Sequence, residues 1–300
     1  MSEFAVRLRR HVVGGTVLHA AGVWDGLSAR IARSAGYQAM FLSGAALSAS
    51  RGLPDAELIT AEDVLATTRE IVRVSDAALL VDLDTGFGDA VTLHHVVKDA
   101  VRAGAAAVMI EDQAAPKVGA IEPGRPPHLA ALSDVVARIT AACDAASGRI
   151  AVVVRSDAGP DEIVDRLLAY GNAGADVLFP LVLDDRLPLA SWREIHERSR
   201  LPLACTLAPG SPVECTMDDR TASSVGVALV VHSLHGLLAA FTALESTYGS
   251  LRRGEPANEI SARSVSYRRV QELVGGDEVR ALRAHLQAGA QDIPSAHSKP

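Results

Sequence analysis

Three acidic residues stand directly behind two apolar segments of the chain. Asp82 and Asp84 follow an apolar run at residues 77–81, and Glu111 follows another at residues 106–110. Residues two apart on a strand point to the same face, so Asp82 and Asp84 should lie side by side. Crowded carboxylates repel one another, and a hard divalent cation with oxygen ligands relieves that repulsion. The pattern predicts a Mg²⁺ site.

A basic residue and a group of small residues follow two further apolar runs. Arg155 comes after the run at residues 150–154, and its planar guanidinium suits a carboxylate or a phosphonate group. Ser43, Gly44 and Ala45 follow a second run and could offer backbone N–H groups to an anion. These positions predict that an acidic ligand binds near the metal.

A purely structural explanation stays open for these residues. The acids could form ion pairs with Arg155 and Lys117, and Asp84 could cap a helix. Arg155 could equally serve only as the partner of Glu111. The clustering of the acids at successive strand ends favours the metal site.

The elements that would position these residues alternate regularly along the chain. Short apolar runs predict strands at residues 17–23, 39–43, 79–83, 106–110, 150–154, 177–180, 203–207 and 227–231. Amphipathic segments predict helices at residues 26–35, 61–74, 92–103, 133–145, 161–172, 189–199, 218–224 and 234–247. Strands that are apolar throughout are typical of parallel sheets covered on both faces. The alternation predicts a (β/α)8 barrel with its active site at the C-terminal strand ends, and a doubly wound open sheet is the alternative.

The chain is expected to divide into a barrel at residues 1–254 and a helical extension with a tail at residues 255–300. The extension is polar at first and becomes helical again near residues 270–286, where it would pack on the barrel or on a neighbouring subunit. Within the barrel, Thr60 and Ser133 are expected N-caps and Gly104 an expected helix end.

The composition limits the classes of function. A net charge of −7 argues against a partner that is nucleic acid or an anionic membrane. No apolar run approaches the roughly 20 residues of a membrane span, and the charged residues 1–10 lack the apolar segment of a signal peptide. The three cysteines show no metal or redox spacing, which predicts a cytoplasmic protein.

Four motifs carry a resemblance to a known family. In chain order they read FLSGAALSASRGLPDAELITAEDVL, LLVDLDTGFGDA, VMIEDQAAPK and VVVRSDA. Over residues 17–248 the chain resembles the isocitrate lyase/phosphoenolpyruvate mutase superfamily, and within it the methylisocitrate lyases. The resemblance implies a barrel that exchanges its last barrel helix between the subunits of a homodimer or homotetramer. It also implies an enzyme that uses Mg²⁺, or Mn²⁺ in its place, to bind a small 2-oxo or 2-hydroxy acid or its enolate.

The resemblance assigns a role to each candidate residue. Asp84 would be the direct metal ligand, with Asp82 and Glu111 completing the magnesium site. Asp55 would lie near the metal and the enolate oxygens, and Arg155 would bind the oxo and carboxylate end. The residues that would bind the substrate carboxylate are Ser43, Gly44 and Ala45.

Two further catalytic assignments rest on weaker parts of the resemblance. Lys117 lies in the segment at residues 113–128, which the resemblance implies is a gate that closes over the substrate. His232 follows the eighth strand, near the place where related oxaloacetate decarboxylases have a contributing histidine. A buried histidine with a structural role is the alternative for His232.

The sequence departs from the lyase pattern at several positions. The lyases carry a Lys-Arg/Lys-Cys-Gly-His loop, whereas residues 117–120 read KVGA, and Gly119 stands at the place of the mutase asparagine. Leu181 replaces a lyase glutamate, and Thr206 and Ala208 replace a polar pair on strand seven. The far side of the pocket is therefore expected to suit an acid with a short or apolar second arm.

Three functions remain open on this sequence. The first is a Mg²⁺-dependent C–C lyase or decarboxylase that works through a pyruvate-type enolate. The second is a C–P enzyme of the phosphonopyruvate hydrolase or phosphoenolpyruvate mutase type, which the short loop favours and Gly119 opposes. The third is a barrel that binds a 2-oxo acid without turnover.

Overall fold

The chain forms two compact units, and the computed structural model describes residues 1–115, 117, 128–181 and 187–291. The first unit is Met1–Ala240 and the second is Phe241–Pro300. The border between them falls inside helix α11 (His235–Arg252).

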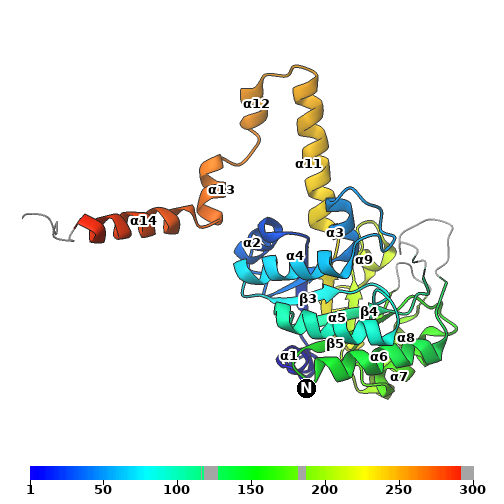
Figure 1. Cartoon of the computed structure of the whole chain (residues 1–300). Coiled ribbons are helices and arrows are strands. Elements are labelled where there is room, and N and C mark those ends of the chain that lie inside the picture. Colours follow the sequence, from blue (N-terminus) through cyan, green and yellow to red (C-terminus); the bar gives the residue numbers. More distant parts are fainter. Residues whose placement is uncertain (116, 118–127, 182–186, 292–300) are drawn as a thin grey trace, which may run out of the picture. The chain divides into compact units, whose positions relative to one another are not determined.

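Eight parallel strands close into a barrel in the first unit (Figure 1). Each strand pairs with the next in sequence, and the eighth pairs back to the first. The (β/α)8 barrel is confirmed, and the open sheet is not formed. The strands are β1 (Leu18–Val23), β2 (Ala39–Leu42), β3 (Ala78–Asp82), β4 (Ala107–Glu111), β5 (Ala151–Ser156), β6 (Val177–Pro180), β7 (Leu203–Thr206) and β8 (Val227–His232).

The helices of the first unit follow the strands as the amphipathic segments predicted. They are α2 (Gly26–Ser34), α4 (Ala61–Val74), α5 (Ala90–Ala103), α6 (Leu132–Ala146), α7 (Ile163–Asn172), α8 (Leu189–Ser199) and α10 (Asp219–Ser224). Three more helices were not expected from the sequence: α1 (Glu3–Gly14), α3 (Gly44–Ser50) and α9 (Pro212–Thr216).

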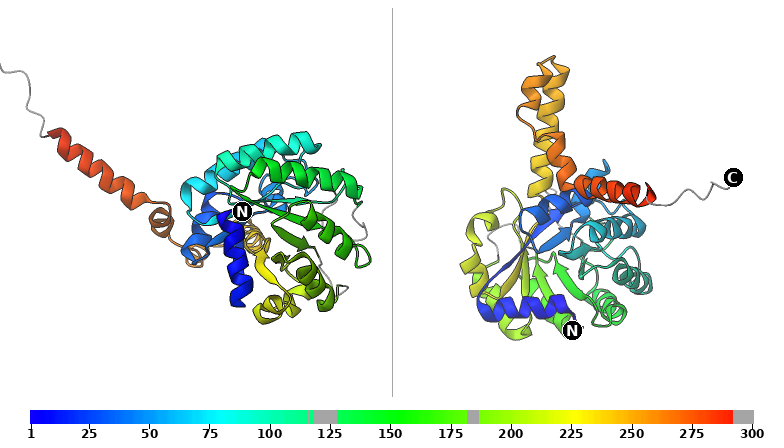
Figure 2. Two further views of the ribbon diagram at one scale, coloured as in Figure 1. Left: turned by 90° about the horizontal axis from the view of Figure 1, so that it is seen from below. Right: turned by 90° about the vertical axis from the view of Figure 1, so that its left-hand side faces the viewer.

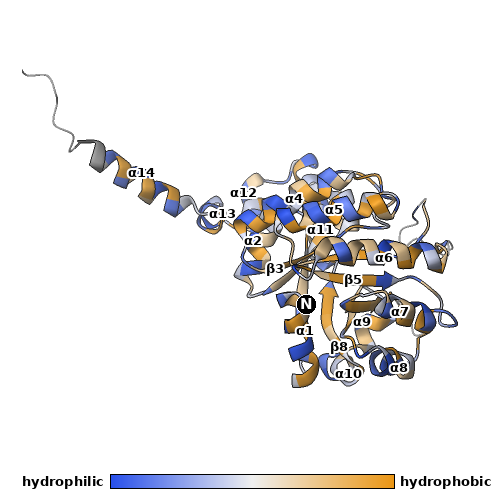
Figure 3. Cartoon of the chain, turned by 60° about the horizontal axis from the view of Figure 1, so that its bottom comes forward, coloured by the Kyte–Doolittle hydropathy of each residue, from blue (hydrophilic) through white to orange (hydrophobic). Residues whose placement is uncertain are grey.

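Helix α1 lies across the N-terminal end of the barrel (Figure 2). Its buried side chains Phe4, Ala5 and Leu8 belong to the same hydrophobic cluster as the residues inside the barrel. That cluster is distinct from the larger one between the strands and the surrounding helices, so the strands are apolar on both faces. Figure 3 shows that strands and helices differ in hydropathy: β8 is coloured mainly hydrophobic, whereas hydrophobic and hydrophilic residues alternate along helices such as α8.

The expected helix ends are partly confirmed. Thr60 caps α4 in a reciprocal capping box with Asp63, and Gly104 ends α5 at a φ of 92°. The cap at Ser133 was wrong, because α6 already begins at Leu132 and the preceding Ala131 makes no side-chain capping bond.

The second unit contains the end of α11 and three short helices, α12 (Ala257–Ser261), α13 (Tyr267–Leu273) and α14 (Gly276–Gln291). The helical region expected near residues 270–286 consists of the two helices α13 and α14. Gly275 separates them at a φ of 87°, a left-handed conformation that interrupts an α-helix and that glycine adopts without strain.

Candidate active site

The predicted acidic residues come together at the C-terminal end of the barrel strands. Asp82 ends β3, Glu111 ends β4, and Asp84 lies in the turn that follows β3. All three carboxylates are buried. Asp55, in the segment after α3, joins them through a shared cation.

That shared cation is the ammonium group of Lys117. It forms a hydrogen bond with Asp84 and lies 3.1 Å from Asp55 Oδ1 and 3.8 Å from Glu111 Oε1. The Lys117 side chain is only 2 % exposed. Burial alone would lower the pKa of Lys117, but the surrounding carboxylates, Glu111 foremost, raise it above its usual value. Lys117 therefore carries a positive charge in the centre of the acids.

Burial also shifts the pKa values of the acidic residues. Desolvation, followed by repulsion from Asp84, raises the pKa of Asp82 to about 6, while Lys117 and Arg155 act in the opposite direction. Burial likewise raises the pKa of Glu111 well above its usual value. These carboxylates are costly to keep ionised without further positive charge, which is the condition a divalent cation would relieve.

Arg155 lies between two acids. Its NH1 group is 2.9 Å from Glu111 Oε2, and its Nε and NH2 groups donate to the two oxygens of Asp157 at 2.6 Å each. Glu111 and Arg155 are also register partners on β4 and β5. The bidentate pair with Asp157 fixes the plane of the guanidinium at the edge of the cavity. The sequence reading left Asp157 without a role, although its place two residues after Arg155 was a usable signal.

The small residues after β2 bring the backbone close to the acids. Gly44 donates its N–H to Asp82 Oδ2 at 3.1 Å, and a Cβ atom on Gly44 would stand 2.8 Å from Asp84 Oδ1. Ser43 caps α3 by accepting from Ala46 N. Glycine is thus required here for close approach, and part of the expected anion-binding backbone already binds the protein's own carboxylate.

Asp84 is held in an unusual backbone conformation by groups that the sequence reading missed. Its φ is +49°, in the left-handed region, and Glu57 nearby has a φ of +54°. The Thr85 hydroxyl donates to Glu57 Oε1 at 2.7 Å, and Arg138 NH1 donates to the Thr85 carbonyl at 2.7 Å. Strained residues at such positions often mark functional sites. No sequence spacing links Glu57, Thr85 and Arg138, because they come from three different elements.

A small cavity of about 60 Å³ opens beside these groups. One side carries the charged residues, and the other side is formed by residues from β6 to the start of α11. The lining residues are Phe41, Ser43, Ala45, Asp55, Asp82, Met109, Lys117, Arg155, Phe179, Leu181, Thr206, Ala208, Ser233 and Leu234.

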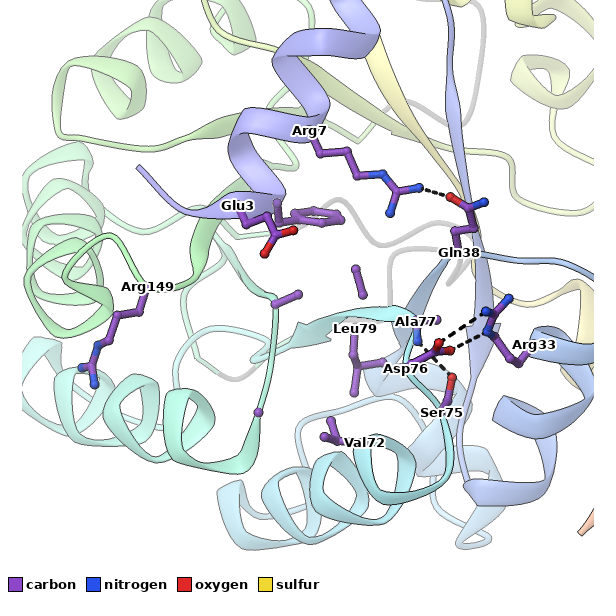
Figure 4. A pocket seen from close by; sticks show the side chains of 14 residues that line it. Glu3, Arg7, Arg33, Gln38, Val72, Ser75, Asp76, Ala77, Leu79 and Arg149 are labelled. Atoms are coloured by element: carbon purple, nitrogen blue, oxygen red, sulfur yellow. Dashed lines mark hydrogen bonds and ion pairs between the residues drawn. The ribbon is translucent and has the colours of Figure 1, made fainter. Parts of the chain in front are cut away.

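Larger cavities lie elsewhere in the first unit. One of about 630 Å³ is at the N-terminal end of the barrel, beside α1 (Figure 4). Two of its arginines already have partners, since Arg33 pairs with Asp76 at 2.5 Å and Arg7 donates to Gln38 at 2.5 Å. Active sites of these barrels lie at the opposite end, so chemistry and not size identifies the small cavity as the candidate site.

His232 is not brought together with the other candidates. Val231 points into the barrel, so its neighbour His232 points outward, where its Nε2 lies 3.0 Å from His19 Nδ1. His19 in turn lies 3.1 Å from Asp219. Burial, with His19 and His235 adding to it, lowers the pKa of His232. The geometry favours a structural role for this histidine.

The oxygen donors around Lys117 have the chemistry of a hard-cation site but not a complete ligand set. Within the described ranges, no three His, Cys, Asp or Glu side chains converge closely enough to hold a metal by themselves. Both oxygens of Glu111 and Oδ1 of Asp55 are nevertheless buried and accept no hydrogen bond from the described residues. Mg²⁺ commonly binds through one or two carboxylates and keeps several waters. These carboxylate oxygens have ion-pair partners in Arg155 and Lys117 but accept no hydrogen bond, and such an oxygen-only set fits that chemistry.

Two sequence expectations can be placed only in part. The gate at residues 113–128 lies mostly outside the described residues, as does the KVGA loop beyond Lys117.

The cysteines Cys143, Cys205 and Cys215 are free, and none of them lines the small cavity. Of the helices that the structure describes, none has the length and apolar composition needed to cross a membrane.

Comparisons with known proteins identify the family and support the fold. Residues 8–252 match the family model described as phosphoenolpyruvate phosphomutase. The chain is 34% identical to 2-methylisocitrate lyase of Bacillus subtilis (strain 168), over 83% of this chain and 82% of that protein.

Solved structures are similar as well. A phosphoenolpyruvate phosphomutase from Streptomyces platensis subsp. rosaceus superposes with a TM-score of 0.84 at 30% identity, covering 94% of this chain and 98% of that one. A 2,3-dimethylmalate lyase, described as a PEP mutase/isocitrate lyase superfamily member, gives 0.82 at 28% identity and covers 100% of both chains.

Proposed function

Because the chain belongs to the phosphoenolpyruvate phosphomutase family of the isocitrate lyase/PEP mutase superfamily, we propose that it is a Mg²⁺-dependent C–C lyase or decarboxylase. Its substrate would be a small 2-oxo or 2-hydroxy acid, and the reaction would pass through a pyruvate-type enolate. One observation carries the proposal: Asp82 and Arg155 line one cavity at the C-terminal strand ends, and the buried Asp84 and Glu111 pair with Lys117 and Arg155, which line the same cavity.

Each residue has a definite task in this proposal. Asp84, Asp82 and Glu111 would hold the metal, which when bound supplies a Lewis acid to the substrate oxygens. Arg155, fixed by Asp157, would bind the carboxylate and oxo end and neutralise the charge that develops there. Ser43 and Ala45 line the same cavity and would position the carboxylate, with Gly44 allowing the close approach.

Lys117 and Asp55 form an ion pair in the same centre. The raised pKa of Lys117 keeps a proton on Nζ at neutral pH, so Lys117 would act as a charge or a proton donor and not as a base. The Asp55 carboxylate pairs with this ammonium, with 3.1 Å between Asp55 Oδ1 and Lys117 Nζ. The pair would adjust the total charge of the site when substrate and metal enter.

A second candidate function is C–P chemistry on phosphonopyruvate. The family model and the Streptomyces structure are both described as phosphoenolpyruvate phosphomutase, which supports it. Arg155 would suit a phosphonate as well as a carboxylate. Both candidates use the same metal and enolate half of the cavity, so only the products separate them.

The experiment is an assay of 2-oxo acid release with and without Mg²⁺. The substrates would be oxaloacetate, 2-methylmalate and related hydroxy diacids, methylisocitrate and phosphonopyruvate. Metal-dependent release from a carbon substrate supports the lyase, and release from phosphonopyruvate alone supports the second candidate. Asp84→Ala serves as the inactive blank and Asp99→Ala, on the exposed side of α5, as the matched control. If no substrate releases a 2-oxo acid but the protein still binds oxalate, the result would indicate a barrel without turnover.

The quaternary structure and compartment are also proposals. Exposed apolar side chains recur on one face of α11 at Phe241, Leu244 and Tyr248, with exposed fractions of 61%, 52% and 65%. We propose that a second copy of the chain covers them by exchange of this helix, in a dimer or tetramer. Free cysteines support a reducing cytoplasm as the compartment.

A further inference from the structure

Asp157, the bidentate partner of Arg155, stands just beyond the end of β5. It follows Ser156, the last residue of the strand, so the hydrogen-bond ladder of the sheet no longer fixes it. Two side chains that follow β4 hold it instead. Asp112 Oδ1 accepts the Asp157 N–H at 2.9 Å, and Gln113 Nε2 donates to Asp157 Oδ2 at 2.7 Å. Asp157 is thus held both at its backbone and at its carboxylate.

The Asp112 carboxylate is itself fixed in one orientation. Its side chain is fully buried, and its Oδ2 accepts from Ser156 Oγ at 2.7 Å and from Tyr170 OH at 2.9 Å. Each of these hydroxyls accepts an N–H bond in turn, from Ala158 N and from Arg166 NH1 at 3.3 Å each. Their hydrogens are therefore directed at Asp112. The two carboxylate oxygens have separate partners, so the carboxylate cannot rotate without breaking hydrogen bonds.

The orientation of Arg155 depends on this support. Its contact with Glu111 is an ion pair in which the Glu111 oxygens accept no hydrogen bond from the described residues, so that contact does not fix the plane of the guanidinium. The two hydrogen bonds with Asp157 do fix it. Asp112 and Gln113 are not among the described residues that line the small cavity. Any effect that they have on a ligand there must pass through other side chains.

We infer that Asp112 and Gln113 are positioning residues that orient Arg155 for its ligand by way of Asp157. Neither side chain would touch the ligand. The inference rests on the proposed function, because Arg155 is the group that binds the carboxylate and oxo end there. A small displacement of a binding group can cost a large factor in affinity or rate. Loss of either support should therefore weaken binding although no ligand contact is removed.

The test is a double-mutant cycle with Asp157→Ala, in which oxalate is titrated calorimetrically into the full-length protein in the presence of Mg²⁺. With Asp157 in place, Asp112→Ala and Gln113→Leu should each weaken oxalate binding roughly tenfold. In the Asp157→Ala background no carboxylate remains to be positioned, so the same changes should alter the affinity less than about twofold. The two changes remove different supports, so Gln113→Leu decides the question if Asp112→Ala does not fold.

Tyr170→Phe separates positioning from stability. It removes the donor that α7 supplies to Asp112 Oδ2 but leaves the bond between Oδ1 and the Asp157 N–H. We expect a lower melting temperature, because the Asp112 carboxylate loses a hydrogen bond. Oxalate affinity should stay within about twofold of the wild type. A loss of affinity that only followed stability would appear in this variant as well.

Four results would overturn the inference while wild-type oxalate binding leaves the proposed function intact. The first is an equal weakening with and without the Asp157 carboxylate, and the second is an unchanged affinity in Asp112→Ala or Gln113→Leu. The third is a Tyr170→Phe variant that binds as weakly as Asp112→Ala. The fourth is a complete loss of binding in Asp157→Ala, because removal of an orienting group should leave a weakened site. No oxalate binding by the wild type overturns the proposed function, and the inference with it.

Discussion

The ammonium of Lys117 lies 3.1 Å from the carboxylate of Asp55, in the centre of the acids at the barrel mouth. The same ammonium bonds to Asp84 and approaches Glu111. A single buried positive charge thus compensates carboxylates from three segments of the chain. The Lys117 ammonium therefore lies among the carboxylates that we propose as metal ligands.

Replacement of Lys117 should therefore destabilise the metal-free protein. Lys117→Met leaves the buried carboxylates without their cation, a change that typically costs about 3–5 kcal/mol. Mg²⁺ should restore much of this loss, so it should raise the melting temperature of Lys117→Met more than that of the wild type. Thermal unfolding with and without Mg²⁺ measures both effects. Lys98→Met, on α5 and away from the cavity, is the control. An equal Mg²⁺ shift in wild type and Lys117→Met would contradict a shared position for the two cations.

The stability of the metal-free protein should depend on the ionisation of Asp82. Its pKa is raised to about 6 by burial and by Asp84. Because the pKa of Asp82 is higher in the folded protein than in the unfolded chain, the folded state gains stability from the protonated carboxyl. This gain is fully present below the pKa of an ordinary carboxyl group and is lost as pH rises through about 6. At about 1.4 kcal/mol per pKa unit, the loss is about 3 kcal/mol.

Asp82→Asn tests this pH dependence, because the amide cannot ionise. Wild type should lose stability relative to Asp82→Asn between about pH 4 and pH 7, as measured by urea unfolding in the presence of a chelator. Asp99→Asn, at an exposed position, should follow the wild-type profile. A stability difference that is constant with pH would show that the Asp82 carboxyl keeps its ordinary pKa.

His232 should prove structural. His232→Gln keeps a polar atom near the position of Nε2 facing His19 but removes the ring. We expect turnover close to that of the wild type, because the residue points away from the cavity, and a loss of stability of about 1 kcal/mol. Steady-state kinetics and thermal unfolding provide the two readouts, with His95→Gln as the control. A loss of turnover without a loss of stability would restore the catalytic role that the sequence suggested.

The exposed face of α11 should control assembly. Wild type should elute as a dimer or tetramer in size-exclusion chromatography with light scattering. The double change Phe241→Asp and Leu244→Asp should shift it to the monomer, because charges at an apolar interface are costly to desolvate. Glu245→Gln on the same helix is the matched control. A monomeric wild type at micromolar concentration would contradict the proposed helix exchange.

The sequence predicted the barrel and the charged half of the site for a common reason. Alternating apolar and amphipathic segments report the strands and helices directly, and parallel strands in a barrel all end at one face, so Asp82, Glu111 and Arg155 had to converge. The direction of His232 was also available, because side chains alternate along a strand and Val231 belongs to the interior.

Other features depend on contacts between distant segments. The docking of helix α1 through Phe4 and Leu8 on the barrel interior is one such feature, although Ser2 and Gly15 were usable signals for the two ends of the helix. The support of the Asp84 turn by Glu57 and Arg138 joins three elements. The position of the Lys117 ammonium likewise follows from four carboxylates on three segments and could not be predicted from its neighbours in the chain.

The most direct test of the central claim is a titration of oxalate, a planar mimic of the pyruvate enolate, into the wild-type protein with and without Mg²⁺. We expect tight binding only when Mg²⁺ is present, and loss of this dependence in Asp84→Ala but not in Asp99→Ala. Equal oxalate affinity with and without the metal, or an unchanged Mg²⁺ dependence in Asp84→Ala, would contradict a metal-assisted enolate site at these acids.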